Sequence, residues 1–111
     1  MRYHGSCHCG AVTFAFDEDA PITEGRRCNC SICVRKGIVI SARYYELAEV
    51  AGLAGLSVYL WNDRDCRHYF CPTCGVYPFS EANGRYRVNL GCVDGVDSLA
   101  LHIEILDGRS L

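Results

Sequence analysis

The chain has 111 residues, half of them apolar, and a formal net charge of −2. This composition predicts a single globular domain over residues 1–111, and without a broad basic field it argues against nucleic acid as the main partner. No apolar run approaches the roughly 20 residues that a membrane span needs, and the first residues lack the apolar region of a signal peptide, so we expect a cytoplasmic protein with no membrane partner.

Short β-like segments follow one another along the chain. Alternating or β-branched apolar residues predict strands at 11–16, 38–42, 56–61, 67–70, 76–80, 85–90 and 99–105. Turns are expected at 62–65 and 81–84, the latter containing the strong hairpin signal Asn83-Gly84. Residues 27–36 predict a short helical turn, whereas 44–51 fits a helical turn or a strand. Taken together, these predicted strands and turns indicate an all-β (β-rich) fold of antiparallel strands.

Nine cysteines stand out in so short a chain, and seven of them form three groups. The groups are Cys7-x-Cys9-Gly10, Cys28-x-Cys30-x-x-Cys33 and Cys71-x-x-Cys74-Gly75, with Cys66 and Cys92 left over. The odd count, the missing signal peptide and the tight C-x-C spacing disfavour a disulfide scaffold. We therefore expect reduced cysteines that bind metal.

The two cysteine pairs together supply four ligands, the number that a structural zinc site uses. We predict a structural zinc on Cys7, Cys9, Cys71 and Cys74. Each pair ends in a glycine, which tolerates positive φ and lets the chain turn tightly around the sulfurs. His8 lies between two of these sulfurs, and we expect it to turn away from the metal.

The cysteine triplet has only three sulfurs, and no fourth cysteine or histidine follows nearby. Three protein ligands are typical of catalytic zinc, which keeps a position for water or substrate. A soft thiolate ligand suits such a site. We predict a catalytic zinc on Cys28, Cys30 and Cys33, beside positive charges at Arg26, Arg27, Arg35 and Lys36.

Two alternatives stay open at the triplet. Cys66, His68 or Cys92 could close the site and make it structural, and the basic cluster could be an ordinary solvated surface. No side chain stands out as a general acid; His68 and Tyr69 are the candidates.

The order and flanks of the three motifs resemble those of a known family. Gly5-Ser6-Cys7-His8-Cys9-Gly10, then Cys28 to Gly37, then Phe70-Cys71-Pro72-Thr73-Cys74-Gly75 are similar to the glutathione-dependent formaldehyde-activating enzyme (Gfa-like) family, which also contains centromere protein V. Arg87 to Gly91 resembles that family's strand and turn after the second pair. The resemblance implies an Mss4-like fold, the structural zinc on the two pairs and the catalytic zinc on the triplet.

The function that this resemblance implies is a zinc-dependent carbon–sulfur lyase of the S-(hydroxymethyl)glutathione synthase type. Such an enzyme uses two Zn²⁺ per chain and handles an adduct of a small thiol, glutathione being the first candidate, with a small aldehyde such as formaldehyde. The alternatives are a non-catalytic zinc-binding module for a thiol or protein partner, and a purely structural double-zinc domain. Exposed edge strands would permit a homodimer.

Overall fold

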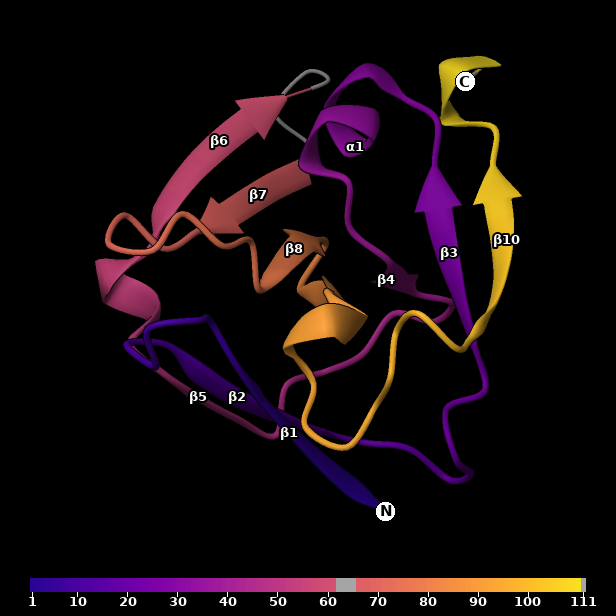
Figure 1. Ribbon diagram of the computed structural model, residues 1–111. Helices are drawn as coiled ribbons and strands as arrows, with labels where there is room; N and C mark the ends of the chain where they lie inside the picture. The colour runs from indigo at the N-terminus through magenta and orange to yellow at the C-terminus, as the bar shows by residue number, and fades with distance from the viewer. Residues whose placement is uncertain (62–65, 111) are drawn as a thin grey trace.

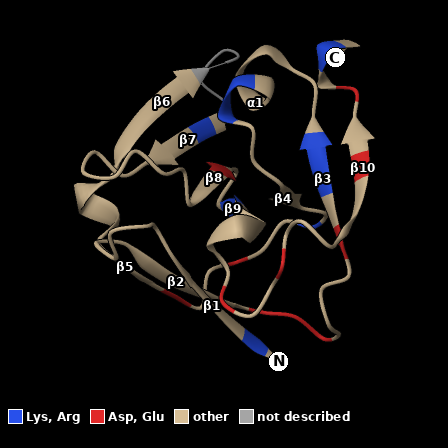
Figure 2. Cartoon of the chain, in the orientation of Figure 1, with Lys and Arg blue, Asp and Glu red and all other residues tan. Residues whose placement is uncertain are grey.

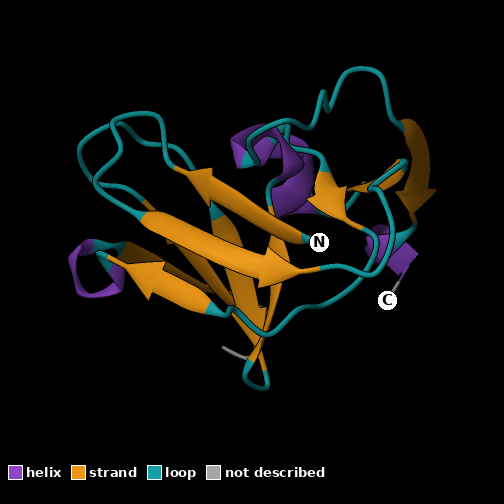
Figure 3. Cartoon of the chain, turned by 90° about the horizontal axis from the view of Figure 1, so that it is seen from below, coloured by secondary structure: helices purple, strands orange, loops and turns teal. Residues whose placement is uncertain are grey.

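The computed structural model describes residues 1–61 and 66–110, and strands are its commonest regular element (Figures 1 and 3). The strands are β1 (Arg2–Ser6), β2 (Thr13–Asp17), β3 (Glu24–Cys28), β4 (Ile40–Ser41), β5 (Glu49–Ala51), β6 (Ser57–Trp61), β7 (Cys66–Phe70), β8 (Phe79–Ala82), β9 (Arg85–Val88) and β10 (His102–Leu106). The helix α1 (Ser31–Lys36) and 3₁₀ turns at Leu53–Gly55, Leu90–Cys92 and Gly108–Ser110 complete the described elements. No described helix has the length and apolar character that crossing a membrane requires.

The strands form three small sheets, with the orders β1-β2-β5, β10-β3-β4 and β6-β7-β8-β9. Neighbouring strands run antiparallel, except that β10 pairs in parallel with β3. The β-rich, antiparallel prediction is therefore confirmed, and it is consistent with an Mss4-like fold. The parallel pair places the C-terminal segment beside the first residues of the cysteine triplet (Figure 1).

The β8–β9 hairpin forms where the sequence predicts it. Asn83 and Gly84 both have positive φ, 54° and 79°, as a two-residue type I′ turn requires. The turn is shorter than predicted because β8 continues through Ala82. Strand β8 also starts later than the strand predicted at 76–80. The carbonyl of Val76 instead accepts the N–H of Cys71 at 2.9 Å, so Val76 belongs to the cysteine loop.

Several predicted boundaries shift in the structure. The segment at 11–16 becomes β2, 38–42 shrinks to β4, and 99–105 becomes β10. The β6 and β7 predictions are confirmed, but the turn predicted at 62–65 lies outside the described residues. The ambiguous segment at 44–51 ends in strand β5 and contains no helix.

Strands β1 and β3 are absent from the sequence prediction because polar and charged residues and a glycine occupy most of their positions, so that neither has an apolar pattern. Gly5 lies under the Phe14 ring, where a Cβ would come within 2.8 Å of the Cys92 carbonyl oxygen. Gly25 is equally tight, since a Cβ there would lie 2.6 Å from a methyl group of Val39. At both positions the missing side chain permits close packing.

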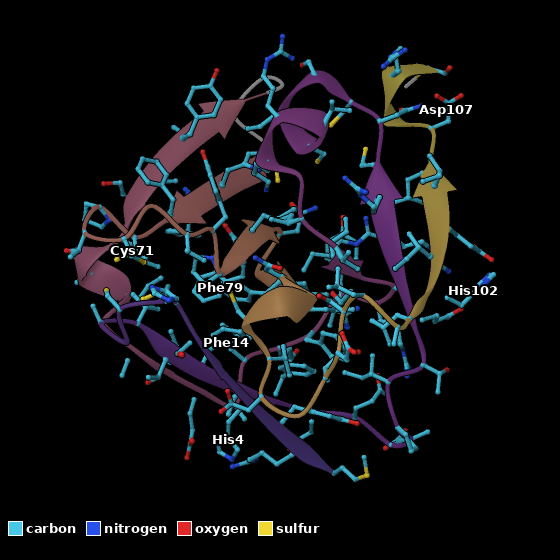
Figure 4. All side chains as sticks on the ribbon, in the orientation of Figure 1. His4, Phe14, Cys71, Phe79, His102 and Asp107 are labelled. Carbon is cyan, nitrogen blue, oxygen red and sulfur yellow. The ribbon has the colours of Figure 1, made fainter. Side chains whose placement is uncertain are left out.

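The hydrophobic core lies between the sheets and contains two of the cysteines. The Phe14 and Phe79 rings meet edge to face at 5.4 Å, near the middle of the molecule (Figure 4). Cys7 and Cys71 belong to the same buried cluster, each at most 2% exposed. One cysteine group is thus continuous with the core.

Candidate metal centres

The cysteine sulfurs gather into two separate groups. The Sγ atoms of Cys7, Cys9, Cys71 and Cys74 all lie within 4.8 Å of one another, and so do those of Cys28, Cys30 and Cys33. We call these groups the four-cysteine centre and the three-cysteine centre. All nine cysteines are free thiols, as expected for reduced, metal-binding residues. The two centres together contain the seven cysteines that the sequence spacing singles out.

The four-cysteine centre has dimensions that suit a zinc ion. Cys9 Sγ lies 3.7 Å from Cys7 Sγ and 3.6 Å from Cys71 Sγ. Four thiolates around zinc, with bonds of about 2.3 Å, place neighbouring sulfurs about 3.8 Å apart. A disulfide would need a separation of about 2.05 Å. The donor set and its spacing therefore fit tetrahedral zinc.

Two tight loops bring these four sulfurs together. One loop joins β1 to β2, and the other follows β7, so the centre ties together segments about sixty residues apart in the sequence. Gly10 and Gly75 have φ of 81° and 77°, which confirms the reason for a glycine after each pair. The N–H of Gly75 donates to the Cys71 carbonyl at 2.7 Å and closes the second loop.

Backbone N–H groups in the loops point at the sulfurs. The N–H groups of Cys74 and Thr73 lower the pKa of the Cys71 thiol. Those of Val76 and Cys9 lower the pKa of the Cys74 thiol to about 6. The second loop therefore favours thiolates, the form that binds metal. In the first loop, the Ala11 N–H lowers the pKa of Cys9, but the neighbouring thiols of Cys71 and Cys7 outweigh it and raise that pKa to about 11. His8 is exposed and outside the sulfur group, as the sequence predicts.

The three-cysteine centre lies where β3 leads into α1. Cys28 ends β3, Cys30 is the N-cap residue of α1, and Cys33 lies in its first turn. The N–H of Cys30 donates to Cys28 Sγ at 3.5 Å, which folds the loop around the sulfurs. Gly37 then ends the helix with φ of 67°, its N–H bonded to the Cys33 carbonyl at 3.0 Å. The predicted helical turn in 27–36 is confirmed.

The three thiols of this centre differ in acidity. Burial opposes ionisation of Cys30, but the N–H of Cys33 and the neighbouring thiols outweigh it and lower the Cys30 pKa. Burial raises the pKa of the Cys33 thiol to about 12, and the charge of Lys36 opposes that rise. A dication placed among the sulfurs would favour the thiolate form of all three.

The predicted candidates for a fourth ligand, Cys66, His68 and Cys92, all lie outside the three-sulfur group. Among the residues that the structure describes, no other histidine, cysteine or carboxylate joins the three sulfurs within 4.8 Å. Cys92 lies instead beside the four-cysteine centre: burial raises its pKa to about 11, and Cys7 and Cys74 add to the rise. Cys66 lies nearer the triplet, since the charge of Cys30 contributes to raising the Cys66 pKa after burial.

The side chains of the predicted basic cluster do not act as one group, because they contact different partners. Arg26 faces the β-sheet carboxylates Glu24 and Glu104 at 3.6 and 3.5 Å, and Arg35 donates to the Ser31 carbonyl at 2.8 Å. Lys36 turns inward, with its Nζ 3.1 Å from His68 Nδ1. Burial lowers the pKa of Lys36, and the nearby thiols oppose that fall.

The structure argues against His68 as a general acid and places the ring of Tyr69, the other candidate, against the core. Burial, followed by the charge of Lys36, lowers the pKa of His68 to about 4, so its imidazole is neutral at pH 7. The Tyr69 ring packs against the core residue Phe79 with centroids 5.6 Å apart. Proton delivery by a charged imidazole at neutral pH is therefore not supported.

Sequence reasoning missed the contacts between the three-cysteine loop and the C-terminal turn. Asn29 donates through Nδ2 to Asp107 Oδ1 at 3.0 Å and accepts the N–H of Arg109 at 2.9 Å (Asp107 is labelled in Figure 4). The N–H of Asn29 also bonds the Leu106 carbonyl at 3.1 Å. These contacts depend on the parallel β3–β10 pairing, for which no local sequence signal exists.

Comparisons with known proteins agree with this geometry. The family model described as glutathione-dependent formaldehyde-activating enzyme matches residues 2–107. The crystal structure of a Rhodobacter sphaeroides protein aligns with a TM-score of 0.76 at 30% sequence identity, covering 93% of this chain and 99% of that one. The family match supports a glutathione-dependent formaldehyde-activating or related function. With both cysteine centres inside the matched range, the chain belongs to the glutathione-dependent formaldehyde-activating enzyme family.

Proposed function

We propose that this protein is a zinc-dependent carbon–sulfur lyase that joins a small thiol to a small aldehyde, with glutathione and formaldehyde as the first pair. The four-cysteine centre would hold a structural zinc and the three-cysteine centre a catalytic one. The observation that carries this proposal is the difference between the centres. Four sulfurs complete a tetrahedron, whereas three leave a position for substrate.

The chemistry needs a thiolate and a carbonyl carbon. Zinc at the three-cysteine centre would lower the pKa of the substrate thiol and orient its sulfur. The sulfur forms a bond to the aldehyde carbon, the carbonyl π pair moves to oxygen, and this oxygen takes a proton from water to replace the one the thiol lost. The overall addition of the thiol to the aldehyde is redox-neutral, and the reverse reaction breaks the same carbon–sulfur bond.

The protein residues around the centre set the charge and the shape of the site. Cys28, Cys30 and Cys33 fix three positions, and Lys36 places a positive charge where a fourth, substrate thiolate adds a negative one. His68 is buried and neutral, so it positions Lys36 rather than supplying a proton. Because the cysteines must stay reduced, we place this activity in the cytoplasm.

The test is exchange spectroscopy by NMR on glutathione and formaldehyde, with catalytic amounts of the zinc-loaded protein. We expect faster exchange between free and adducted glutathione than in buffer. Cys33→Ser should abolish the acceleration, while Cys66→Ser, which removes a nearby thiol outside the three-sulfur group, should retain it. Metal analysis should give two zinc ions per wild-type chain and one in Cys33→Ser.

The results of this experiment distinguish an enzyme from a binding module and test whether Cys66 is a zinc ligand. An exchange rate equal to that in buffer would remove the enzymatic proposal for this thiol–aldehyde pair and leave a binding module. Loss of zinc and activity in Cys66→Ser would show that this thiol closes the three-cysteine centre. Retention of full activity in Cys33→Ser would contradict a catalytic role for the centre.

A further inference from the structure

A pocket lies beside the three-cysteine centre, between α1 and strand β6. It has a volume of about 480 Å³, within the range of small-ligand sites. Its lining residues are Ser31, Ile32, Arg35, Lys36, Tyr59 and Tyr77. Two of these are cations and two carry phenolic hydroxyls, and the lining that the structure describes contains no carboxylate. Figure 2 shows the basic charge on α1 where the helix faces β6 and β7.

Lys36 joins this pocket to the metal centre. It follows Cys33 by three residues on α1, so the two side chains share one face of the helix. Its Nζ is held over the Tyr77 ring, 4.9 Å from the centroid, and 3.1 Å from His68 Nδ1. Two contacts from neighbouring segments thus fix an ammonium group at the boundary between the pocket and the thiols.

We propose that this pocket binds a carboxylate of the thiol substrate, with Lys36 as the specificity-determining residue. The assignment rests on the proposed function, because it requires the substrate sulfur to bind at the three-cysteine centre. The substrate class is then a small thiol that carries a carboxylate, as glutathione does. A half-buried ammonium attracts an anion more strongly than a fully solvated one, because less water screens the pair.

Arg35 is a weaker candidate for the same role. It lines the pocket but is exposed, and its guanidinium already donates to the Ser31 carbonyl at 2.8 Å. Exposed charges contribute little to binding in salt. The tyrosines contribute hydroxyl donors and ring surface but no charge. Discrimination between charged and uncharged thiols therefore rests mainly on Lys36.

The test measures thiol binding to the cobalt-substituted protein through the change in the cobalt d–d absorption bands. The probes are 3-mercaptopropionate and 6-mercaptohexanoate, each compared with its own methyl ester. We expect the wild-type protein to bind at least one acid about tenfold more tightly than its ester, because a charge-assisted hydrogen bond is lost in the ester. Lys36→Met should remove this preference, so that each acid and its ester bind this variant with affinities within about twofold of one another.

Two further variants control this experiment. Lys36→Arg keeps a cation at the position and should retain the preference. Arg27→Met removes an exposed cation that is next to Cys28 but outside the pocket lining, and it should change neither affinity. Ester binding by Lys36→Met also shows that this variant is folded and metal-loaded.

The results distinguish the assignment from the function on which it rests. Equal affinity of the wild-type protein for both acids and their esters would overturn the pocket assignment alone. A preference that persists in Lys36→Met would overturn the role of Lys36. Absence of a spectral response to all four probes would overturn the proposed thiol-binding function, and the assignment with it.

Discussion

Gly108 packs directly against Cys28, so that a Cβ built on Gly108 would overlap the Cys28 sulfur. The same Cβ would lie 3.1 Å from the Cβ of Cys30. Leu106 pairs with Cys28 in the parallel β3–β10 register, and Asn29 bonds the turn that follows. The C-terminal turn therefore forms one wall of the three-cysteine centre, and only a residue without a side chain fits there.

Gly108→Ala should weaken metal binding at the three-cysteine centre. The added methyl group must displace either the Cys28 sulfur or the turn, and overpacking of this kind costs about 1–3 kcal/mol. We expect the affinity of this centre for zinc to fall about tenfold, measured by competition with a chromophoric chelator, while the four-cysteine centre keeps its metal. Gly55→Ala is the matched control, because that glycine also lies in a 3₁₀ turn and has open space around it. Equal zinc affinity in both variants would contradict the steric argument.

The metal centres are predictable from sequence where the relevant contacts are local. C-x-C and C-x-x-C spacings converge within a loop of a few residues, and glycines at positions 10 and 75 permit the turns that close these loops. Joining Cys7 and Cys9 to Cys71 and Cys74 needs only the coordination number of zinc. The Asn83-Gly84 hairpin is predictable for the same reason, since the turn conformation depends on those two residues.

Contacts that depend on distant pairing are not predictable in this way. Four basic residues surround the triplet in sequence, and only the position of β7 decides that Lys36 meets His68. Cys92 follows a glycine in a loop, and only the contact of that loop with β1, through the Gly5–Val93 bridge, places it near Cys7. Gly108 has no motif at all, because its role depends on the β3–β10 register.

Glu18 should make the stability of the fold depend on pH. Its side chain is only 9% exposed and accepts hydrogen bonds from the Tyr45 hydroxyl, the Asp19 N–H and Arg43. Burial alone would raise the pKa of Glu18, but these donors outweigh it and hold the pKa below 4.5. A lowered pKa in the folded state stabilises the fold above the unfolded-state pKa near 4.5, and this stabilisation is lost as pH falls through the folded-state value.

Replacing Glu18 by Gln removes this contribution. We expect Glu18→Gln to lower the free energy of unfolding by about 2 kcal/mol at pH 7, and the difference from wild type to shrink as pH falls below 4.5. Urea unfolding of both proteins from pH 7 to pH 3.5 measures this, and metal release in acid affects both alike. Asp19→Asn, at the exposed neighbouring carboxyl, should show no comparable loss. A constant difference across the whole range would contradict the assignment.

Asn89 should stabilise the segment that carries Tyr77. Its buried side chain donates to the Tyr77 carbonyl at 2.9 Å and accepts the N–H of Gly91 at 3.0 Å. Asn89→Leu leaves both groups without these partners, at a cost of about 1–3 kcal/mol for each buried group. Asn89→Asp keeps an acceptor for Gly91 and loses only the donor to Tyr77, but it also buries a charge. We expect both variants to unfold at lower urea concentrations than wild type; unchanged midpoints would show that water replaces these bonds.

The two metal centres should contribute unequally to folding. Cys71 is 1% exposed and belongs to the hydrophobic core, and its centre connects the β1–β2 loop to the loop after β7. Because metal-binding energy at such a site is folding energy, Cys71→Ser should lose cooperative unfolding or at least about 3 kcal/mol of stability. Cys33 is only half-buried, and its ligand partners lie within six residues. Cys33→Ser should therefore unfold cooperatively with a smaller loss, as measured by circular dichroism in urea. The reverse ranking would mean that the three-cysteine centre holds the fold together.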